Sequence, residues 1–111
     1  MQAPAPPAAG SLRGFSERQR RHLRGLAHGL KPVIRAGQAG LTGALVRETE
    51  RALEDHELIK VKAAGGDRPA RDALFAALAE RTASALIQRI GNVAVLYRPH
   101  PALPRILIPD R

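Results

Sequence analysis

The sequence predicts an α/β domain with the element order α-β-α-β-α-β-β and one four-stranded mixed sheet packed with helices. Segments with apolar residues at helical spacing separate segments whose apolar residues alternate. Strands joined through helices need crossover connections, so part of the sheet should be parallel. The last two alternating segments are joined only by Gly91-Asn92, a turn typical of an antiparallel hairpin. A G-x-x-G loop, Gly37 to Gly40, lies between the first strand and the second helix.

The first helix is expected over residues 16–30. Ser16 and Gln19 fit the S-x-x-Q capping box that opens a helix, and Pro32 should end it by Lys31. The apolar residues at helical spacing, which should form its buried stripe, are Leu23, Leu26, Ala27 and Leu30. Basic residues occupy the rest of the circumference, namely Arg18, Arg20, Arg21 and Arg24. The prediction is a basic amphipathic helix, weakened by its two glycines.

A strand over residues 31–36 leads into the glycine loop, and a second helix follows over about 42–55. Thr42 is expected to cap this helix, with Leu41 and Val46 as a hydrophobic staple. The predicted buried stripe is Leu45, Thr49, Ala52 and Leu53. Five carboxylates fall within residues 48–57, and we expect them on a solvated face, without the burial that would tune a pKa.

A second strand is expected over residues 57–64, where apolar and polar residues alternate cleanly. One face carries Ile59, Val61 and Ala63, and the other carries Lys60 and Lys62. Asp67 should cap a third helix, which tolerates Pro69 in its first turn. The predicted core face of this helix is Ala70, Ala73, Leu74, Ala77 and Leu78. Residues 83–98 complete the sheet as the hairpin.

The chain divides into a proline- and alanine-rich tail over residues 1–15, one patterned domain over 16–99 and a proline-rich extension over 100–111. The tail is expected to be disordered, and the extension to be an extended strap or a loose tail. The tail lacks the basic and apolar regions of a secretory signal, and no apolar run approaches the ~18 residues of a membrane span. There are no cysteines. We therefore expect a cytoplasmic protein without a cofactor or a metal ion.

The formal net charge of +8 is unevenly distributed. Residues 1–47 carry +7, residues 48–57 carry −4 and residues 58–111 carry +5. One side of the molecule should therefore attract polyanions. Only three aromatic residues are present, Phe15, Phe75 and Tyr97, which argues against a platform for stacking bases. A nucleic acid would be held mostly through its phosphates.

Three kinds of site can use a glycine-rich strand-to-helix loop. A P-loop is excluded, because no Lys follows Gly40 at the place where that motif contacts phosphate. A dinucleotide fingerprint is disfavoured, because Gly37, Gly40 and Gly43 are spaced three apart. A G-x-x-G loop that grips a nucleic-acid backbone fits, since its amides and the following helix N-terminus both favour an anion. The structural alternative is a tight turn that uses glycine only for positive φ.

Three stretches resemble one known family: "RQRRHLRGLAHGLKPVIRAGQAGLT", "ALEDHELIKVK" and "IGNVAVLYRP". They are similar to the CRM domain, named for chloroplast RNA splicing and ribosome maturation, and most of all to its bacterial stand-alone YhbY form. The resemblance covers about residues 16–99. It implies a compact α/β fold, RNA contact by the loop Gly37-Gln38-Ala39-Gly40, and association with precursors of the large ribosomal subunit. Two departures, the N-terminal tail and the glycine-rich "AAGGDRPARD", are not expected to touch the loop.

We therefore expect a non-catalytic protein that binds structured ribosomal RNA and acts in assembly of the large (50S) subunit. We expect it to be a monomer that binds neither a membrane nor a small-molecule substrate. The predicted RNA-binding residues are Gly37, Gln38, Ala39, Gly40, Lys31, Arg35, Thr42, Arg18, Arg21, Arg24, His28, Lys60, Lys62, Arg89 and Arg98. Two alternatives stay open at this point: a general nucleic-acid or DNA-binding protein, and a protein–protein adaptor that uses the acidic helix face. His28 could equally pack beside the loop, and Lys60 and Lys62 could form a solvated sheet face.

Overall fold

The computed structural model describes residues 14–110, so most of the predicted tail lies outside the described residues. The elements are α1 (Glu17–Ala27), β1 (Ile34–Ala36), α2 (Gly43–His56), β2 (Leu58–Ala63), α3 (Arg68–Arg81), β3 (Ala85–Ile90) and β4 (Val93–Tyr97). The predicted order is confirmed. Within this part of the chain no helix is long and apolar enough to cross a bilayer.

The four strands form one sheet in the order β1-β2-β4-β3. The β1–β2 pair is parallel, and the β2–β4 and β3–β4 pairs are antiparallel, as expected for a mixed sheet. The hairpin turns at Gly91-Asn92, where Gly91 has a φ of +58°. This left-handed conformation explains the glycine at the first position of the turn.

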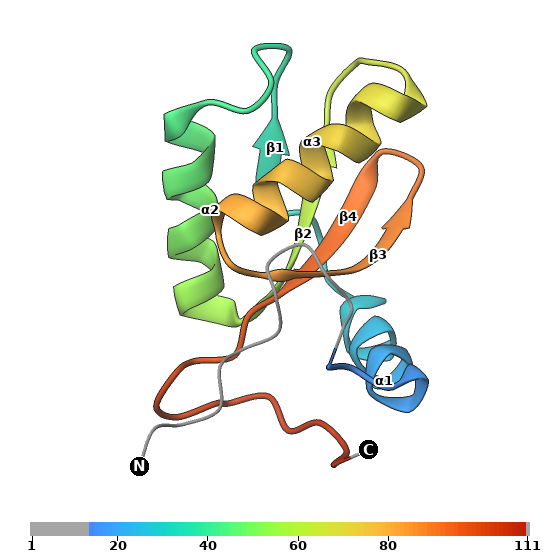
Figure 1. Ribbon diagram of the computed structural model, residues 1–111, viewed down its shortest axis with the longest axis vertical. Coiled ribbons are helices and arrows are strands. Elements are labelled where there is room, and N and C mark those ends of the chain that lie inside the picture. Colours follow the sequence, from blue (N-terminus) through green and yellow to red (C-terminus); the bar gives the residue numbers. More distant parts are fainter. Residues whose placement is uncertain (1–13, 111) are drawn as a thin grey trace.

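Helices α2 and α3 cover one face of the sheet (Figure 1). Thr42 and Asp67 cap them as predicted, accepting hydrogen bonds from the Leu45 and Ala70 amides at 3.1 and 2.9 Å. The fully buried large side chains on this face include Leu53, Ile59, Val61, Phe75, Leu78 and Leu96. Leu41 and Val46, the predicted staple, both pack against this cluster.

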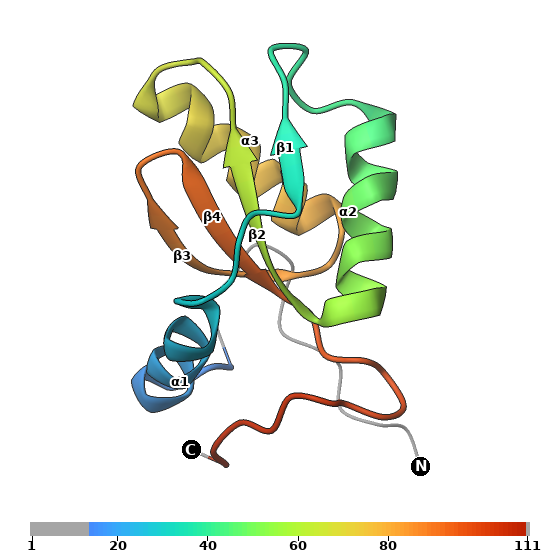
Figure 2. The ribbon, with the colours of Figure 1, turned by 180° about the vertical axis from the view of Figure 1, so that it is seen from behind.

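Among residues 14–110, the opposite face is covered at one end, by α1 and the C-terminal segment (Figure 2). Ser16 and Gln19 make both hydrogen bonds of the capping box, at 2.9 and 3.0 Å. The second buried cluster consists of Leu23, Ala27, Leu58, Ala85, Ile87, Val95 and Tyr97, with Phe15, Ile106 and Ile108 packed around it. Burial, together with the nearby Glu57 charge, raises the pKa of Tyr97 to about 12.

Two helices differ from their predicted patterns. Helix α1 ends at Ala27, earlier than predicted, and Leu26 and Leu30, both predicted in its buried stripe, are 45% and 39% exposed. Glycines on both sides of this end weaken a further turn. In α3 the buried residues are Phe75, Leu78 and Ala79, whereas Ala70 and Ala73 are exposed. Alanines lie all round this helix, so its apolar pattern does not define one face.

Residues 99–110 form an extended strap, and Glu57 anchors it. The Glu57 side chain is 1% exposed, and its carboxylate accepts hydrogen bonds from the amides of His100, Arg105 and Ile106 at 2.6, 2.9 and 2.9 Å. Burial disfavours the charged form, but these three hydrogen bonds outweigh it and lower the pKa of Glu57. The prediction that all five carboxylates of residues 48–57 are solvated is therefore wrong for Glu57, which contacts a segment far away in sequence.

Candidate nucleic-acid interface

The glycine loop is a turn that projects from one end of the sheet (Figures 1 and 2). The Gly40 amide donates to the Gly37 carbonyl at 3.1 Å, and Gly40 has a φ of +75°. Gln38 and Ala39, the two central residues, are exposed. A Cβ atom placed on Gly37 would meet no atom within 4 Å. The loop therefore presents backbone to solvent with little side-chain cover.

Helix α2 begins directly after this loop. Its cap, Thr42, uses its hydroxyl oxygen to accept from Leu45. Gly43 and Ala44 are exposed residues of the first turn, where N–H groups have no carbonyl partner within a helix. The positive end of the helix dipole lies at the same place, so the loop and helix start together favour an anion.

A second glycine turn lies beside the first. Gly65 and Gly66, which connect β2 to α3, have φ values of +73° and +77°. The Gln38 side chain lies against Gly65, 3.8 Å from the position a Cβ atom would take there. The expectation that the "AAGGDRPARD" departure does not touch the loop is therefore wrong. The two turns meet because β1 and β2 are adjacent parallel strands, and their carboxyl ends lie at one edge of the sheet.

The two turns line one groove. Its walls are Gly37, Gln38, Gly40, Ala63, Ala64, Gly65, Gly66, Ala70, Arg71 and Leu74. The Arg71 guanidinium donates to the Gly66 carbonyl at 2.8 Å, which places a cation at the groove. Sequence reasoning did not select Arg71, because only the fold brings α3 next to the loop.

Basic side chains also share the sheet face that α2 and α3 leave open. Arg35 of β1 pairs in register with Lys62 of β2, and Lys60 lies two residues earlier on the same face of β2. The Lys60 ammonium donates to the Leu30 carbonyl at 3.0 Å and to the His28 carbonyl at 3.5 Å. Lys31 is exposed just before β1. Arg35, Lys62 and Lys60 thus form a basic row that starts beside the glycine loop.

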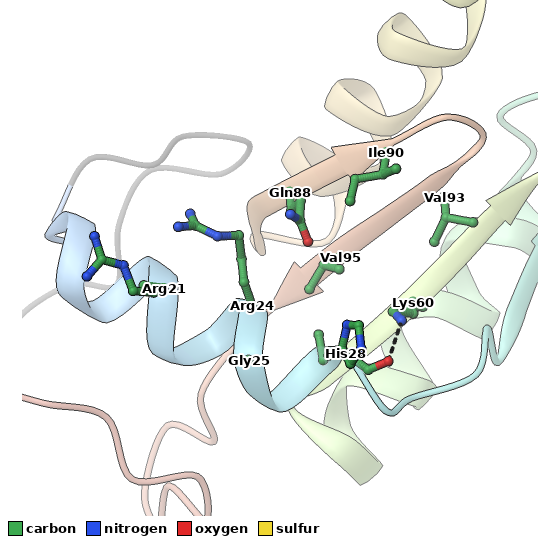
Figure 3. A pocket seen from close by; sticks show the side chains of 10 residues that line it. Arg21, Arg24, Gly25, His28, Lys60, Gln88, Ile90, Val93 and Val95 are labelled. Atoms are coloured by element: carbon green, nitrogen blue, oxygen red, sulfur yellow. Dashed lines mark hydrogen bonds between the residues drawn. The ribbon is translucent and has the colours of Figure 1, made fainter.

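Helix α1 continues this row. Arg21, Arg24 and His28 line a groove between α1 and the β3–β4 hairpin, with Lys60 at its end (Figure 3). Arg24 also donates to Glu17 at 2.9 Å. That hydrogen bond and the charge of Arg20 lower the pKa of Glu17. Arg18 is exposed on α1 outside the groove.

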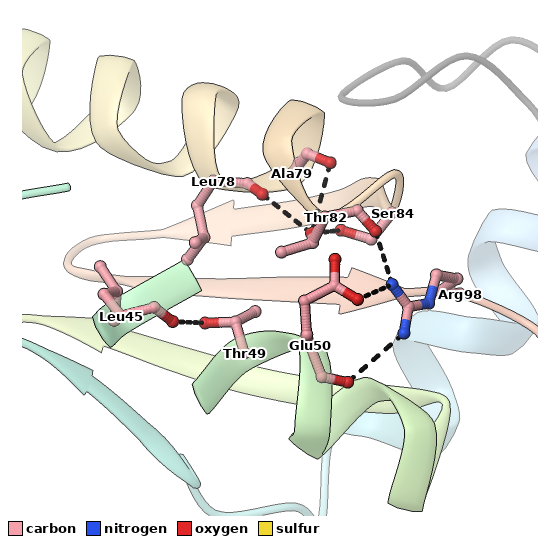
Figure 4. Close-up of polar contacts among 8 residues, drawn as sticks. All are labelled: Leu45, Thr49, Glu50, Leu78, Ala79, Thr82, Ser84 and Arg98. Atoms are coloured by element: carbon pink, nitrogen blue, oxygen red, sulfur yellow. Dashed lines mark hydrogen bonds and ion pairs between the residues drawn. The ribbon is translucent and has the colours of Figure 1, made fainter. Parts of the chain in front are cut away.

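Arg98 and Arg89 lie apart from these residues. Arg98 donates to the Glu50 carboxylate at 2.8 Å and to the Thr82 carbonyl at 2.7 Å (Figure 4). It follows Tyr97, which pairs with Leu58 at the end of the sheet opposite the loop. Arg89 forms an ion pair with Asp72 of α3, on the face that α3 covers. The structure therefore does not bring these two arginines to the basic row.

The sequence model of the CRS1/YhbY (CRM) domain family matches residues 15–98. This chain belongs to the CRM domain family. The curated relatives agree with this assignment. An "RNA-binding protein" of Haemophilus influenzae is 48% identical to this chain, and the match covers 77% of this chain and 86% of the relative's length. A "Probable RNA-binding protein" of Pseudomonas aeruginosa is 43% identical, and the match covers 78% of this chain and 84% of the relative's length.

A solved structure shows the same fold. The solution structure of a hypothetical Staphylococcus aureus protein, described as a candidate RNA-binding protein, superposes with a TM-score of 0.74 at 33% identity. The match covers 85% of this chain and 98% of that one. This CRM domain therefore presents its glycine loop and basic row on the family fold.

The chemistry that this arrangement supports is anion binding. Backbone amides of the loop and of the first turn of α2 can donate to phosphate oxygens. The basic row adds ammonium and guanidinium groups, which pair with phosphate through charge-assisted hydrogen bonds. The loop, Thr42, Arg35, Lys62, Lys60, Arg21, Arg24 and His28 fall along this path, whereas Arg89 and Arg98 do not.

Proposed function

We propose that this protein binds structured ribosomal RNA without catalysing a reaction, and that it acts in the cytoplasm in assembly of the large ribosomal subunit. The observation that carries the proposal is the exposed turn Gly37–Gly40 immediately before the α2 N-terminus, beside the row of Arg35, Lys62 and Lys60. The names given to the relatives from Haemophilus influenzae and Pseudomonas aeruginosa support RNA as the ligand.

In the proposed mechanism the loop clamps the RNA backbone. Its amides and those of the first turn of α2 hold one or two phosphates, and the basic row extends the contact along the open sheet face. Such contacts follow the shape of the backbone, so a folded RNA is selected largely by its shape.

The double substitution Gln38→Asp with Ala39→Asp tests the loop. Both residues are exposed and neither has a positive φ, so the turn should tolerate aspartate. Two carboxylates at the phosphate site cost several kcal/mol of like-charge repulsion, so affinity for a large-subunit rRNA fragment should fall by about 100-fold. The measurement is a binding titration at fixed salt, with thermal unfolding as the check on folding.

The matched control is the pair Arg51→Gln with Arg81→Gln. It changes the net charge by the same amount, at exposed positions of α2 and α3. This control should retain most of the rRNA affinity. Equal binding by the double aspartate variant and the wild type would contradict the loop mechanism.

Two further arms test the choice of RNA. Duplex DNA of similar length should bind more weakly than the rRNA fragment at matched salt, and equal affinity would favour a general nucleic-acid-binding protein. In a sedimented cell extract, the protein should crosslink to rRNA in the fractions that contain large-subunit precursors. Its absence from all ribosomal fractions would contradict the assembly role.

A further inference from the structure

The groove between α1 and the β3–β4 hairpin differs in chemistry from the glycine loop. It encloses about 530 Å³ and lies at the far end of the basic row. This volume is within the ~300–1,000 Å³ of typical small-ligand sites. Figure 3 shows α1 on one side, the hairpin on the other and Lys60 next to His28.

The hairpin wall of the groove is apolar. Val95 belongs to the buried cluster beneath, and Val93 and Ile90 line the groove above it. Ile90 is 65% exposed, although it is a large aliphatic side chain in a strand. Phosphate gains nothing from an apolar wall, so backbone binding alone does not account for this side of the groove. A flat, apolar group would bury Ile90 and Val93.

Polar groups surround this wall. The Lys60 ammonium has three N–H donors, and the carbonyls of Leu30 and His28 fix it at the end of the groove. Within residues 14–110, no protein group forms a hydrogen bond with the side-chain amide of Gln88, which also lines the groove. An amide offers one acceptor and two donors, which suits the edge of a nucleobase.

We propose that this groove holds one unpaired base of the bound RNA. The base face packs on Ile90 and Val93, Gln88 contacts the base edge, and Lys60 and Arg21 hold the adjoining phosphates. A cationic rim around an apolar wall complements a nucleotide, which joins a flat base to an anionic backbone. Unpaired bases that leave the stack are the parts of RNA that proteins can read in this way.

The position of the groove supports the same ligand. Lys62 lies one pleat beyond Lys60 on the same face, about 7 Å away along the strand, and pairs with Arg35 next to the loop. An RNA backbone held at the glycine loop can therefore follow the basic row to the groove. The inference rests on the proposed function, and it adds recognition of an unpaired nucleotide to binding by shape.

The experiment starts from the large-subunit rRNA fragment that the wild-type protein binds most tightly. A second RNA has the same stems but with each bulged nucleotide deleted. The wild-type protein should bind the bulged RNA about tenfold tighter than the fully paired one. With 2-aminopurine at the bulge, its fluorescence should rise on binding, because the base leaves the stack.

Ile90→Ser and Gln88→Ala each change the groove without changing the charge. Each should reduce the preference for the bulged RNA to about twofold or less and remove the fluorescence rise. Affinity for the paired RNA and its salt dependence should not change. The matched control is Leu103→Ser, because Leu103 is also a highly exposed aliphatic residue, at 76%, but lies outside the groove. Gln88→Ala provides an independent test if Ile90→Ser weakens the hairpin.

Two results would overturn the inference while leaving the proposed function in place. One is that the wild-type protein binds bulged and paired RNA with equal affinity, while the variant with Gln38→Asp and Ala39→Asp loses affinity for both RNAs. The other is a preference for bulged RNA that survives both groove substitutions, since the base would then be bound elsewhere. If the wild-type protein binds no rRNA fragment, the proposed function fails and the inference fails with it.

Discussion

Gly37 and Gly40 occupy the two ends of one turn, but the fold requires glycine at only one of them. Gly40 has a φ of +75°, a conformation that other residues adopt at a cost of ~1–2 kcal/mol. Gly37 has no positive φ, and a Cβ atom there would meet nothing within 4 Å. The missing side chain at Gly37 therefore serves no contact inside the described chain. It leaves room for a ligand to approach the backbone.

This difference predicts opposite effects of two alanine substitutions on stability. Gly40→Ala should lower the free energy of unfolding by ~1–2 kcal/mol. Gly37→Ala should leave it unchanged or raise it by ~0.4–1 kcal/mol, because the unfolded chain loses conformational freedom. Gly37→Ala should nevertheless weaken RNA binding, since its methyl group would lie between the loop amides and the phosphate that we propose they bind. Denaturant unfolding and RNA titration of both variants make the measurement.

The outcome for Gly37→Ala separates the two interpretations of the loop. Wild-type RNA affinity in this variant would mean that Gly37 is only part of a turn. Reduced affinity in a protein that is as stable as the wild type would mean that the surface of the loop, and not its conformation, is used.

At the level of elements, the C-terminal strap depends on one carboxylate. Glu57 ends α2 with a φ of +64° and accepts three amides of the strap. Gln19 and His22 of α1 contact the strap carbonyls of Pro109 and Leu107 at 2.7 and 2.9 Å. The strap therefore joins the end of α2 to α1 and covers the second buried cluster.

The lowered pKa of Glu57 gives this link a pH dependence. A carboxyl group with a depressed folded-state pKa contributes stability above its ordinary pKa of 4.5 and loses it as the pH falls through the folded-state value. Glu57→Gln should therefore lower the free energy of unfolding at pH 7 by ~1–3 kcal/mol. Below pH 4.5 the difference from the wild type should shrink. Urea unfolding at pH 7, 5 and 3 measures both effects.

The exposed Glu54 supplies the control for this prediction. Glu54→Gln removes the same charge from the same helix without touching the strap amides. It should unfold like the wild type at each pH. A Glu57→Gln variant that also behaves like the wild type would show that the three hydrogen bonds do not stabilise the fold.

The elements also show which features a sequence can predict. The caps Ser16, Thr42 and Asp67 were predicted because each cap contacts an amide only three residues away. Glu57 was misassigned because its partners lie more than forty residues downstream in the strap. The glycine loop was recognised from local spacing. Its neighbour Gly65 was missed because the contact exists only once β1 and β2 pair.

At the scale of the whole molecule, two residues of the same charge, Lys62 and Arg98, have different surroundings. Lys62 lies in the basic row on the open sheet face, whereas Arg98 binds Glu50 and Thr82 at the opposite end of the sheet. Charge counting along the sequence treats the two alike. The fold separates a cation available to a polyanion from one that holds α2, α3 and β4 together.

This separation predicts different results for two substitutions that remove the same charge. Lys62→Gln should reduce the slope of log affinity against log salt concentration by ~0.7–0.9, the loss of one phosphate contact, and leave stability nearly unchanged. Arg98→Gln should leave the slope unchanged but lower the free energy of unfolding by ~2–4 kcal/mol, because Glu50 and the Thr82 carbonyl lose their partner. Salt titrations of RNA binding and denaturant unfolding test the pair. A reduced slope for Arg98→Gln would place that arginine on the RNA.

The edges of the sheet have a consequence for how the protein behaves when crowded with other copies of itself. An open strand edge can pair with another chain and so seed aggregates. Here one edge strand, β1, is only three residues long and carries Arg35. The other edge strand, β3, is interrupted by a bulge between Leu86 and Gln88. Neither edge offers a long, regular row of free backbone groups, so the described strands give another copy of the chain little backbone to pair with.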